Sequence, residues 1–118
     1  MKRVTTKKGL MNPTFISSWL IEPPSLCDTL IDYFESNTKK QAKGYSGTGV
    51  NTNIKDSIDI SISPKDILLP GNEVFNQYFE ELFECHQDYI SQWSFLKENS
   101  MKFEIGVFNL QRYKAGQH

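Results

Sequence analysis

Residues 102–113 read Lys-Phe-Glu-Ile-Gly-Val-Phe-Asn-Leu-Gln-Arg-Tyr, and this stretch decides the predicted fold. Successive side chains of a strand point to opposite faces. The odd-numbered positions are apolar for three residues and then polar for three: Phe103, Ile105, Val107, Asn109, Gln111 and Tyr113. That order predicts the interior face of a barrel that is packed at its base and hydrated at its mouth. On the even-numbered side, Phe108 and Leu110 indicate partial cover by a helix.

Two helices are predicted upstream. An apolar run over 15–21 is typical of a strand, and Pro23-Pro24 ends it. Ser25 then begins a helix, because its hydroxyl can accept a hydrogen bond from an unpaired backbone N–H of the first turn. The apolar stripe of this helix consists of Leu26, Leu30 and Phe34, with Cys27 and Ile31 beside them. The helix is expected to end near Asn37.

The second helix is predicted over residues 72–96, the longest periodic segment. Its apolar positions recur at helical spacing: Phe75, Tyr78, Phe79, Leu82, Phe83, His86, Tyr89, Ile90 and Trp93. We interpret Glu80, Glu81 and Glu84 as the solvated face of this helix. The aromatic stripe is expected to pack on another element, since an exposed apolar face of this size promotes aggregation.

A strand is predicted from residue 57 to residue 62. Ile58, Ile60 and Ile62 alternate with Asp59 and Ser61, which is typical of a half-buried strand. The preceding segment, 41–53, is polar and rich in glycine, so it is predicted to be a loop. Its stretch 44–49 lacks the Gly-Lys-Ser/Thr ending of a phosphate-binding loop, and a mobile loop is the favoured interpretation.

Tyr113 and Gly116 form a Tyr-x-x-Gly motif at the end of the last predicted strand. Four upstream features precede it in order: the apolar run over 15–20, a Cys-x-x-Leu-Ile helix over 27–31, a basic-x-Ser element over 55–57 and the long aromatic helix. Over about residues 14–117, this series resembles the prolyl-4-hydroxylase-like branch of the iron(II)/2-oxoglutarate-dependent dioxygenases.

The resemblance implies an α+β fold, with two helices packed on part of a double-stranded β-helix, or jelly-roll, sheet. The implied activity is oxidative decarboxylation of 2-oxoglutarate coupled to hydroxylation of a substrate C–H bond. Iron(II) and 2-oxoglutarate are the implied cofactors, with ascorbate as a further candidate. Tyr113 is the one cofactor-binding residue that the resemblance assigns, through a hydrogen bond from its phenol to 2-oxoglutarate.

The family's metal ligands lie in a His-x-Asp motif that would fall after His118. The resemblance therefore assigns no metal ligand and no catalytic residue within 1–118, and no cofactor is expected for this chain alone. Residues 14–118 are expected to be the N-terminal part of a single dioxygenase domain, preceded by a flexible basic N-terminus over 1–13. His86-Gln87-Asp88 also reads His-x-Asp, but two residues apart on a helix point in nearly opposite directions and cannot share a metal.

Composition narrows the other possibilities. The chain has 118 residues, a formal net charge of −1 and two cysteines, Cys27 and Cys85. Two cysteines without Cys-x-x-Cys spacing favour neither a disulfide framework nor a zinc site. No basic face interleaves with aromatic residues, so nucleic-acid binding is not expected. Without a signal peptide or an apolar run long enough for a membrane span, the expected location is the cytoplasm.

A second class of function stays open on the residues alone. The chain is alternatively a catalytically inactive interaction module that uses the aromatic helix and an open strand edge. An open reading frame that continues past codon 118 into His-x-Asp would favour the enzyme, and a stop codon would favour the module. For the enzyme, a small-molecule cosubstrate is implied. The substrate is left open between peptidyl proline, another protein side chain and a small metabolite, as is the oligomeric state.

Overall fold

The computed structural model describes residues 1–4, 15–99 and 104–118. These residues form two compact units, one of Met1–Thr29 with Val74–Glu104 and the other of Leu30–Glu73 with Ile105–His118. Both contain helices and antiparallel strands, which confirms the predicted α+β class. The described residues form one two-stranded and one three-stranded sheet, so the jelly roll stays a prediction.

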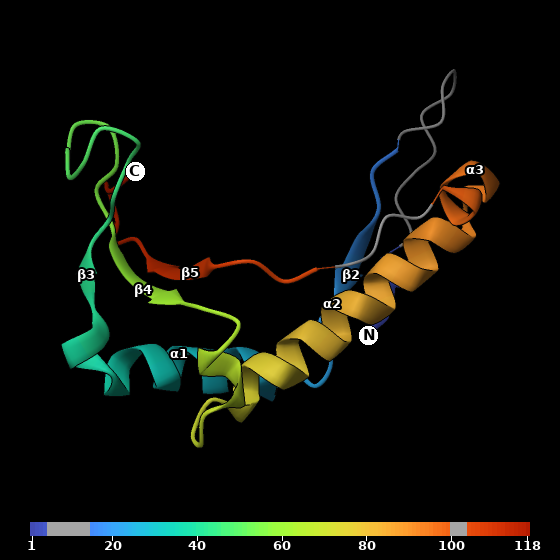
Figure 1. Cartoon of the computed structure of the whole chain (residues 1–118), viewed down its shortest axis with the longest axis horizontal. Helices are drawn as coiled ribbons and strands as arrows, with labels where there is room; N and C mark the ends of the chain where they lie inside the picture. The colour runs from blue at the N-terminus through green and yellow to red at the C-terminus, as the bar shows by residue number, and fades with distance from the viewer. Residues whose placement is uncertain (5–14, 100–103) are drawn as a thin grey trace. The chain divides into compact units, whose positions relative to one another are not determined.

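The first unit contains a two-stranded sheet and most of the long helix (Figure 1). Strand β1 (Lys2–Val4) pairs antiparallel with β2 (Ser18–Leu20), in a register that places Arg3 opposite Trp19. Residues 1–13 were expected to be a flexible N-terminus, but Lys2–Val4 form a paired strand. The rest of that segment, residues 5–13, lies outside the described residues. The strand predicted over 15–21 is confirmed only in its second half, by β2.

The long helix is shorter than the sequence predicts. Helix α2 spans Glu73–Ser91, and α3 (Ser94–Glu98) follows as a separate helix. Between them Trp93 has extended backbone angles, φ −130° and ψ 95°. Within α2, Phe75 is 1% exposed and Phe83 is 48% exposed, so the prediction that Phe83 is buried was wrong. The buried side chains of α2, Val74 and Phe75, lie in its first turn.

Helix α1 (Ser25–Ser36) confirms the first predicted helix. Leu26 and Phe34 are buried as expected, whereas Cys27 and Ile31 are exposed. The predicted N-cap differs. The backbone N–H groups of Leu26 and Cys27 donate to the carbonyl oxygens of the two residues before Ser25, Pro23 and Pro24, each at 3.0 Å. Backbone carbonyl oxygens thus accept the hydrogen bonds of first-turn N–H groups, a role that the sequence predicts for the Ser25 hydroxyl.

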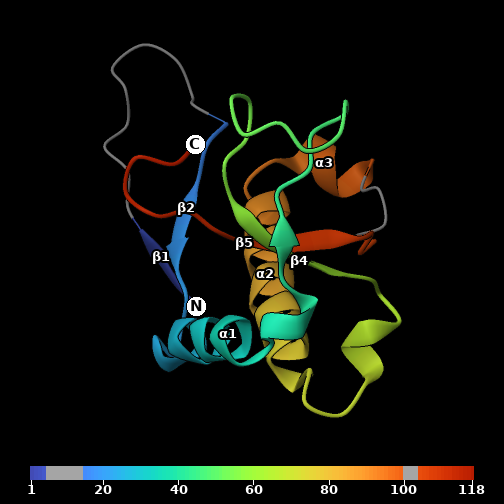
Figure 2. The ribbon, with the colours of Figure 1, turned by 90° about the vertical axis from the view of Figure 1, so that its left-hand side faces the viewer.

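The second unit is built on the sheet β3–β4–β5 (Figure 2). Strand β3 spans Ala42–Lys43, β4 Ile58–Ile62 and β5 Phe108–Arg112, and both pairings are antiparallel. Short 3-10 helices occupy Thr38–Lys40 and Asp66–Leu68. Phe34, Ile60, Ile62 and Ile67 are the buried apolar side chains of this unit.

The two faces of this sheet differ in chemistry. Residues paired across β4 and β5 point to the same side, and the pairs Ile58–Arg112, Ile60–Leu110 and Ile62–Phe108 define the apolar face. The Arg112 guanidinium lies 5.0 Å from the centre of the Phe34 ring, and its Nη1 donates to Glu35 of α1 at 2.8 Å. Helix α1 thus contacts the even-numbered side at Arg112, while Phe108 and Leu110 on that side are half-buried.

The packed base that the sequence predicts for the odd-numbered side is not shown at Val107, whereas Ile105 is half-buried and Phe103 lies outside the described residues. Strand β5 begins only at Phe108, Val107 is exposed before it, and residues 100–103 lie outside the described residues. Asn109 and Gln111 are exposed on the face opposite α1. This face is polar, with Asn109 and Gln111 exposed along β5 and Asp59 buried on β4.

Candidate functional site

Tyr113 directly follows β5 on the odd-numbered side. Its side chain is 44% exposed, so a ligand can reach the hydroxyl. The chain then turns: the Gln117 N–H donates to the Lys114 carbonyl at 3.0 Å, and the Lys114 N–H donates to Gln117 Oε1 at 2.7 Å. Gly116 has φ +84°, a conformation that favours glycine. The Tyr-x-x-Gly motif thus consists of a strand end and a tight turn.

A polar cluster lies on the same face of the sheet and is centred on Asp59 of β4. Its carboxylate accepts hydrogen bonds from Lys55 Nζ at 2.6 Å, from Ser57 Oγ at 2.7 Å and from Gln111 Nε2 at 3.2 Å. Asp59 is 7% exposed and Ser57 2% exposed. Three donors fill most of the acceptor positions of one carboxylate, so the cluster is nearly saturated.

Gly44 closes this cluster on the side of β3. Its backbone N–H donates to the Ser57 carbonyl at 2.8 Å. A Cβ atom at position 44 would overlap Ser57 Oγ and would lie 3.0 Å from Lys55 Cε. Glycine at this position therefore leaves space for the cluster, which gives Gly44 a packing role.

Opposing effects set the ionisation of Asp59. Burial acts to raise the pKa of its carboxyl group, but the hydrogen bonds from Lys55 and Ser57, the positive charge of Lys55 and the hydrogen bond from Gln111 together lower the pKa below 3.8. Asp59 is consequently ionised at neutral pH, and the nearby Lys55 balances its charge. The face as a whole presents neutral hydrogen-bonding groups to a ligand, from Asn109, Gln111 and Tyr113.

The described residues offer no iron site. Among them, no group of three or more His, Cys, Asp or Glu side chains is arranged to hold a metal ion. The Asp88 carboxylate accepts a hydrogen bond from Trp19 Nε1 at 2.8 Å, which directs it toward β2. His118 Nε2 lies 3.2 Å from the Asn53 carbonyl oxygen, and its own carbonyl accepts from the Asp56 N–H. His86 belongs to the first unit and His118 to the second.

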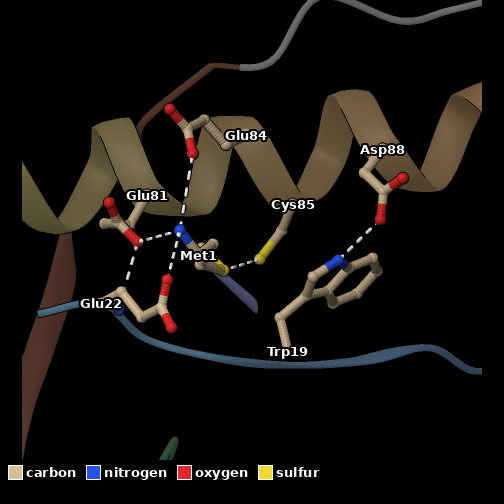
Figure 3. A network of polar contacts seen from close by, with 7 residues as sticks. All are labelled: Met1, Trp19, Glu22, Glu81, Glu84, Cys85 and Asp88. Atoms are coloured by element: carbon tan, nitrogen blue, oxygen red, sulfur yellow. Dashed lines mark hydrogen bonds and ion pairs between the residues drawn. The ribbon is translucent and has the colours of Figure 1, made fainter. Parts of the chain in front are cut away.

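A second polar network lies in the first unit around the N-terminal ammonium group (Figure 3). The Met1 nitrogen is 3.4 Å from Glu81, 3.6 Å from Glu22 and 3.8 Å from Glu84. Desolvation acts to lower the pKa of this ammonium group, but Glu81, followed by Glu22 and Glu84, raises it. Glu81 also accepts from the Glu22 backbone N–H at 3.4 Å. The interpretation of Glu81 as a merely solvated residue of α2 was therefore wrong.

The same network extends along α2 to Cys85 and Asp88. The Cys85 thiol donates to the Met1 thioether at 2.7 Å, and Arg3 contacts both Asp88 and Gln92. Burial, followed by the negative charge of Glu81, raises the pKa of Cys85 above 9.0. The contacts of Met1, Arg3 and Trp19 hold β1 and β2 against α2. The raised pKa keeps the Cys85 thiol protonated at neutral pH, so it is a poor nucleophile.

Sequence reasoning did not find either cluster as a whole. Lys55, Ser57 and Asp59 follow one another closely, but Gln111 joins them from 52 residues away. The contacts of Met1 with α2 span about 80 residues. The only sequence evidence for the first cluster was the spacing of Lys55 and Asp59, four residues apart, and such a spacing is common in surface segments.

Comparisons with protein-family models, with curated proteins and with solved structures gave no match. Among the described residues, no helix is long and apolar enough to cross a membrane.

Proposed function

We propose that this chain contributes part of the sheet of an iron(II)/2-oxoglutarate-dependent dioxygenase, with Tyr113 as a contact for 2-oxoglutarate. The observation that carries the proposal is the difference between the two faces of β4–β5. One face is apolar and is contacted by α1 at Arg112, and the other is polar, exposed along β5 and ends at an accessible phenol. A jelly roll with a ligand in its interior needs a sheet of this kind.

The residues present can supply one of the contacts that a 2-oxoglutarate site needs. The Tyr113 hydroxyl can donate a hydrogen bond to a carboxylate, while its ring lies along the carbon chain of the ligand. Gln111 lies two residues earlier on the same side, with its amide tied to Asp59. Lys55 is engaged with Asp59, so it is not free to neutralise a second carboxylate. This chain accordingly supplies one end of a 2-oxoglutarate site.

The described residues do not fit iron(II), since they contain no suitable ligand group. No step of catalysis is therefore assigned to them. Their role in the proposed enzyme is to orient the cosubstrate, because a rigid strand end holds the phenol and the Asp59 cluster fixes its neighbour Gln111.

Titration of the ¹⁵N-labelled chain with 2-oxoglutarate tests this proposal. Chemical shift changes are expected at Gln111, Tyr113 and the 114–117 turn, at millimolar ligand because a single hydrogen bond carries the contact. Sulfate at equal ionic strength is the control for general anion binding. Changes spread over the basic residues, or equal changes with sulfate, would contradict the proposal.

A second candidate function is favoured by the open edge of β5. Only β4 pairs with β5 in the described part of the chain. Unpaired strand edges bind other strands through their backbone N–H and C=O groups. An interaction module would use this edge and would need neither 2-oxoglutarate nor metal.

A further inference from the structure

Strand β5 lacks the features that usually protect an exposed sheet edge. Within Phe108–Arg112 there is no proline and no lysine, and the register with β4 runs without a bulge. Its one charged residue, Arg112, is directed to Glu35 of α1. Natural edge strands commonly carry lysine, proline or a bulge, which hinder pairing with another strand. The free edge of β5 is thus open to a partner strand.

The sequence of β5 is complementary to itself in the antiparallel direction. When two copies pair about Leu110, Phe108 lies opposite Arg112 of the other copy, Asn109 lies opposite Gln111, and Leu110 lies opposite its own equivalent. These pairs place two amides and two aliphatic side chains opposite each other, while the Arg112 guanidinium stays engaged with Glu35 and the Phe34 ring of its own chain. No like charges oppose each other, so this register contains no repulsive pair.

We propose that a second copy of this chain occupies the free edge of β5, in an antiparallel register with its two-fold axis at Leu110. The resulting sheet is continuous and six-stranded, in the order β3-β4-β5-β5-β4-β3. This inference goes beyond the proposed function, because it does not depend on 2-oxoglutarate or on Tyr113. A contact of five residues per copy is small, so the dimer forms reversibly with concentration.

Self-complementarity favours a second copy over other occupants. A foreign peptide or a further strand of the same polypeptide would use the same backbone groups. Neither would require a strand whose second and fourth residues match each other across a two-fold axis at the central residue. Closed two-fold association is also the commonest form of self-association in soluble proteins.

Two double variants test this register, and they differ at a single exposed position. In Asn109→Lys/Gln111→Lys, the register places lysine opposite lysine twice. In Asn109→Glu/Gln111→Lys, it places glutamate opposite lysine twice. Both variants carry Gln111→Lys, which removes the same hydrogen bond to Asp59. Any effect of this change on the Asp59 cluster therefore cancels when the two variants are compared. Sedimentation equilibrium of the 118-residue chain and of both variants measures dimerisation.

The wild-type chain is expected to dimerise with rising concentration. The lysine–lysine variant is expected to dimerise at least roughly four-fold more weakly than the glutamate–lysine variant. This difference should shrink in 1 M salt, which screens exposed charges. A chain that stays monomeric throughout would overturn the proposal and leave the edge to other occupants. Equal dimerisation of the two variants would overturn the register.

Discussion

Lys55 Nζ lies 2.6 Å from Asp59 Oδ2, and this ion pair joins the segment before β4 to the polar face of the sheet. Both side chains are largely buried, and Ser57 and Gln111 hydrogen-bond to the same carboxylate. The pair thus holds together the ends of β4 and β5 beside Tyr113. It gives the open face a fixed set of hydrogen-bonding groups.

Asp59→Asn is expected to destabilise the chain by about 1–3 kcal/mol at neutral pH, because Lys55 loses its buried counter-charge. The folded-state pKa of Asp59 lies below 3.8, so its ionisation stabilises the fold above that pH. The contribution is lost as the pH falls through the lowered pKa. Urea unfolding from pH 7 to pH 2 should show the two proteins converging only below about pH 4. Asp32→Asn, at an exposed position of α1, should stay within about 0.5 kcal/mol of wild type.

Gly44→Ala is expected to cost about 1–3 kcal/mol, because the new methyl group overlaps Ser57 Oγ. Gly47→Ala is the matched control, since a Cβ atom at that position meets nothing within 4 Å. Thermal unfolding of both variants measures the difference. In the double variant Gly44→Ala/Ser57→Ala, the second change removes the overlapping hydroxyl and should recover part of the loss. Equal stability of the two glycine variants would contradict the packing of the cluster.

Cys85 is expected to react slowly with iodoacetamide at neutral pH, since burial and Glu81 raise its pKa. In a Cys27→Ser background, the labelling rate should rise with pH, with its midpoint at a higher pH than for an ordinary exposed cysteine, because the pKa of Cys85 is raised. Glu81→Gln should shift this profile to lower pH, because a negative charge beside the thiolate is removed. Glu80→Gln, on the exposed side of the same helix, should leave the profile in place.

Phe75→Ala is expected to destabilise the fold by about 3–5 kcal/mol, because the ring is almost completely buried. Phe83→Ala removes a ring that is nearly half exposed, and it should cost less than about 1.5 kcal/mol. Chemical denaturation compares the two variants directly. A larger loss of stability for Phe83→Ala would contradict the exposure of Phe83 and would support the continuous packed stripe that helical spacing predicts.

Periodicity predicted the elements better than it predicted their surroundings. The alternation of Ile58, Ile60 and Ile62 located β4, and the apolar spacing after Ser25 located α1. Periodicity also placed Asp59 on the polar face, but it gave no sign that this side chain is buried. One of its hydrogen-bond donors, Gln111, comes from a strand 52 residues away. Such contacts come from topology and not from local pattern.

The long helix shows the same limit. Its spacing continues through Trp93 without glycine or proline, and nothing local predicts the extended backbone there. Likewise, the sequence alone gave no reason for the N-terminus to fold back on α2, because the partners of Met1 are acidic residues of a typical solvated face. Tyr113 was singled out by resemblance to a family. The structure adds that it is accessible and that it ends a polar face.

The affinity of the chain for 2-oxoglutarate, compared between Tyr113→Phe and Tyr45→Phe, tests the central claim most directly. Both variants lose one exposed phenol hydroxyl, but only Tyr113 lies at the end of β5. A hydrogen bond to a charged group is worth about 1.5–3 kcal/mol, and water partly replaces it at an open site, so a several-fold loss is expected for Tyr113→Phe. Tyr45→Phe should bind as wild type. Equal affinity of all three proteins would contradict the assignment of Tyr113 to 2-oxoglutarate.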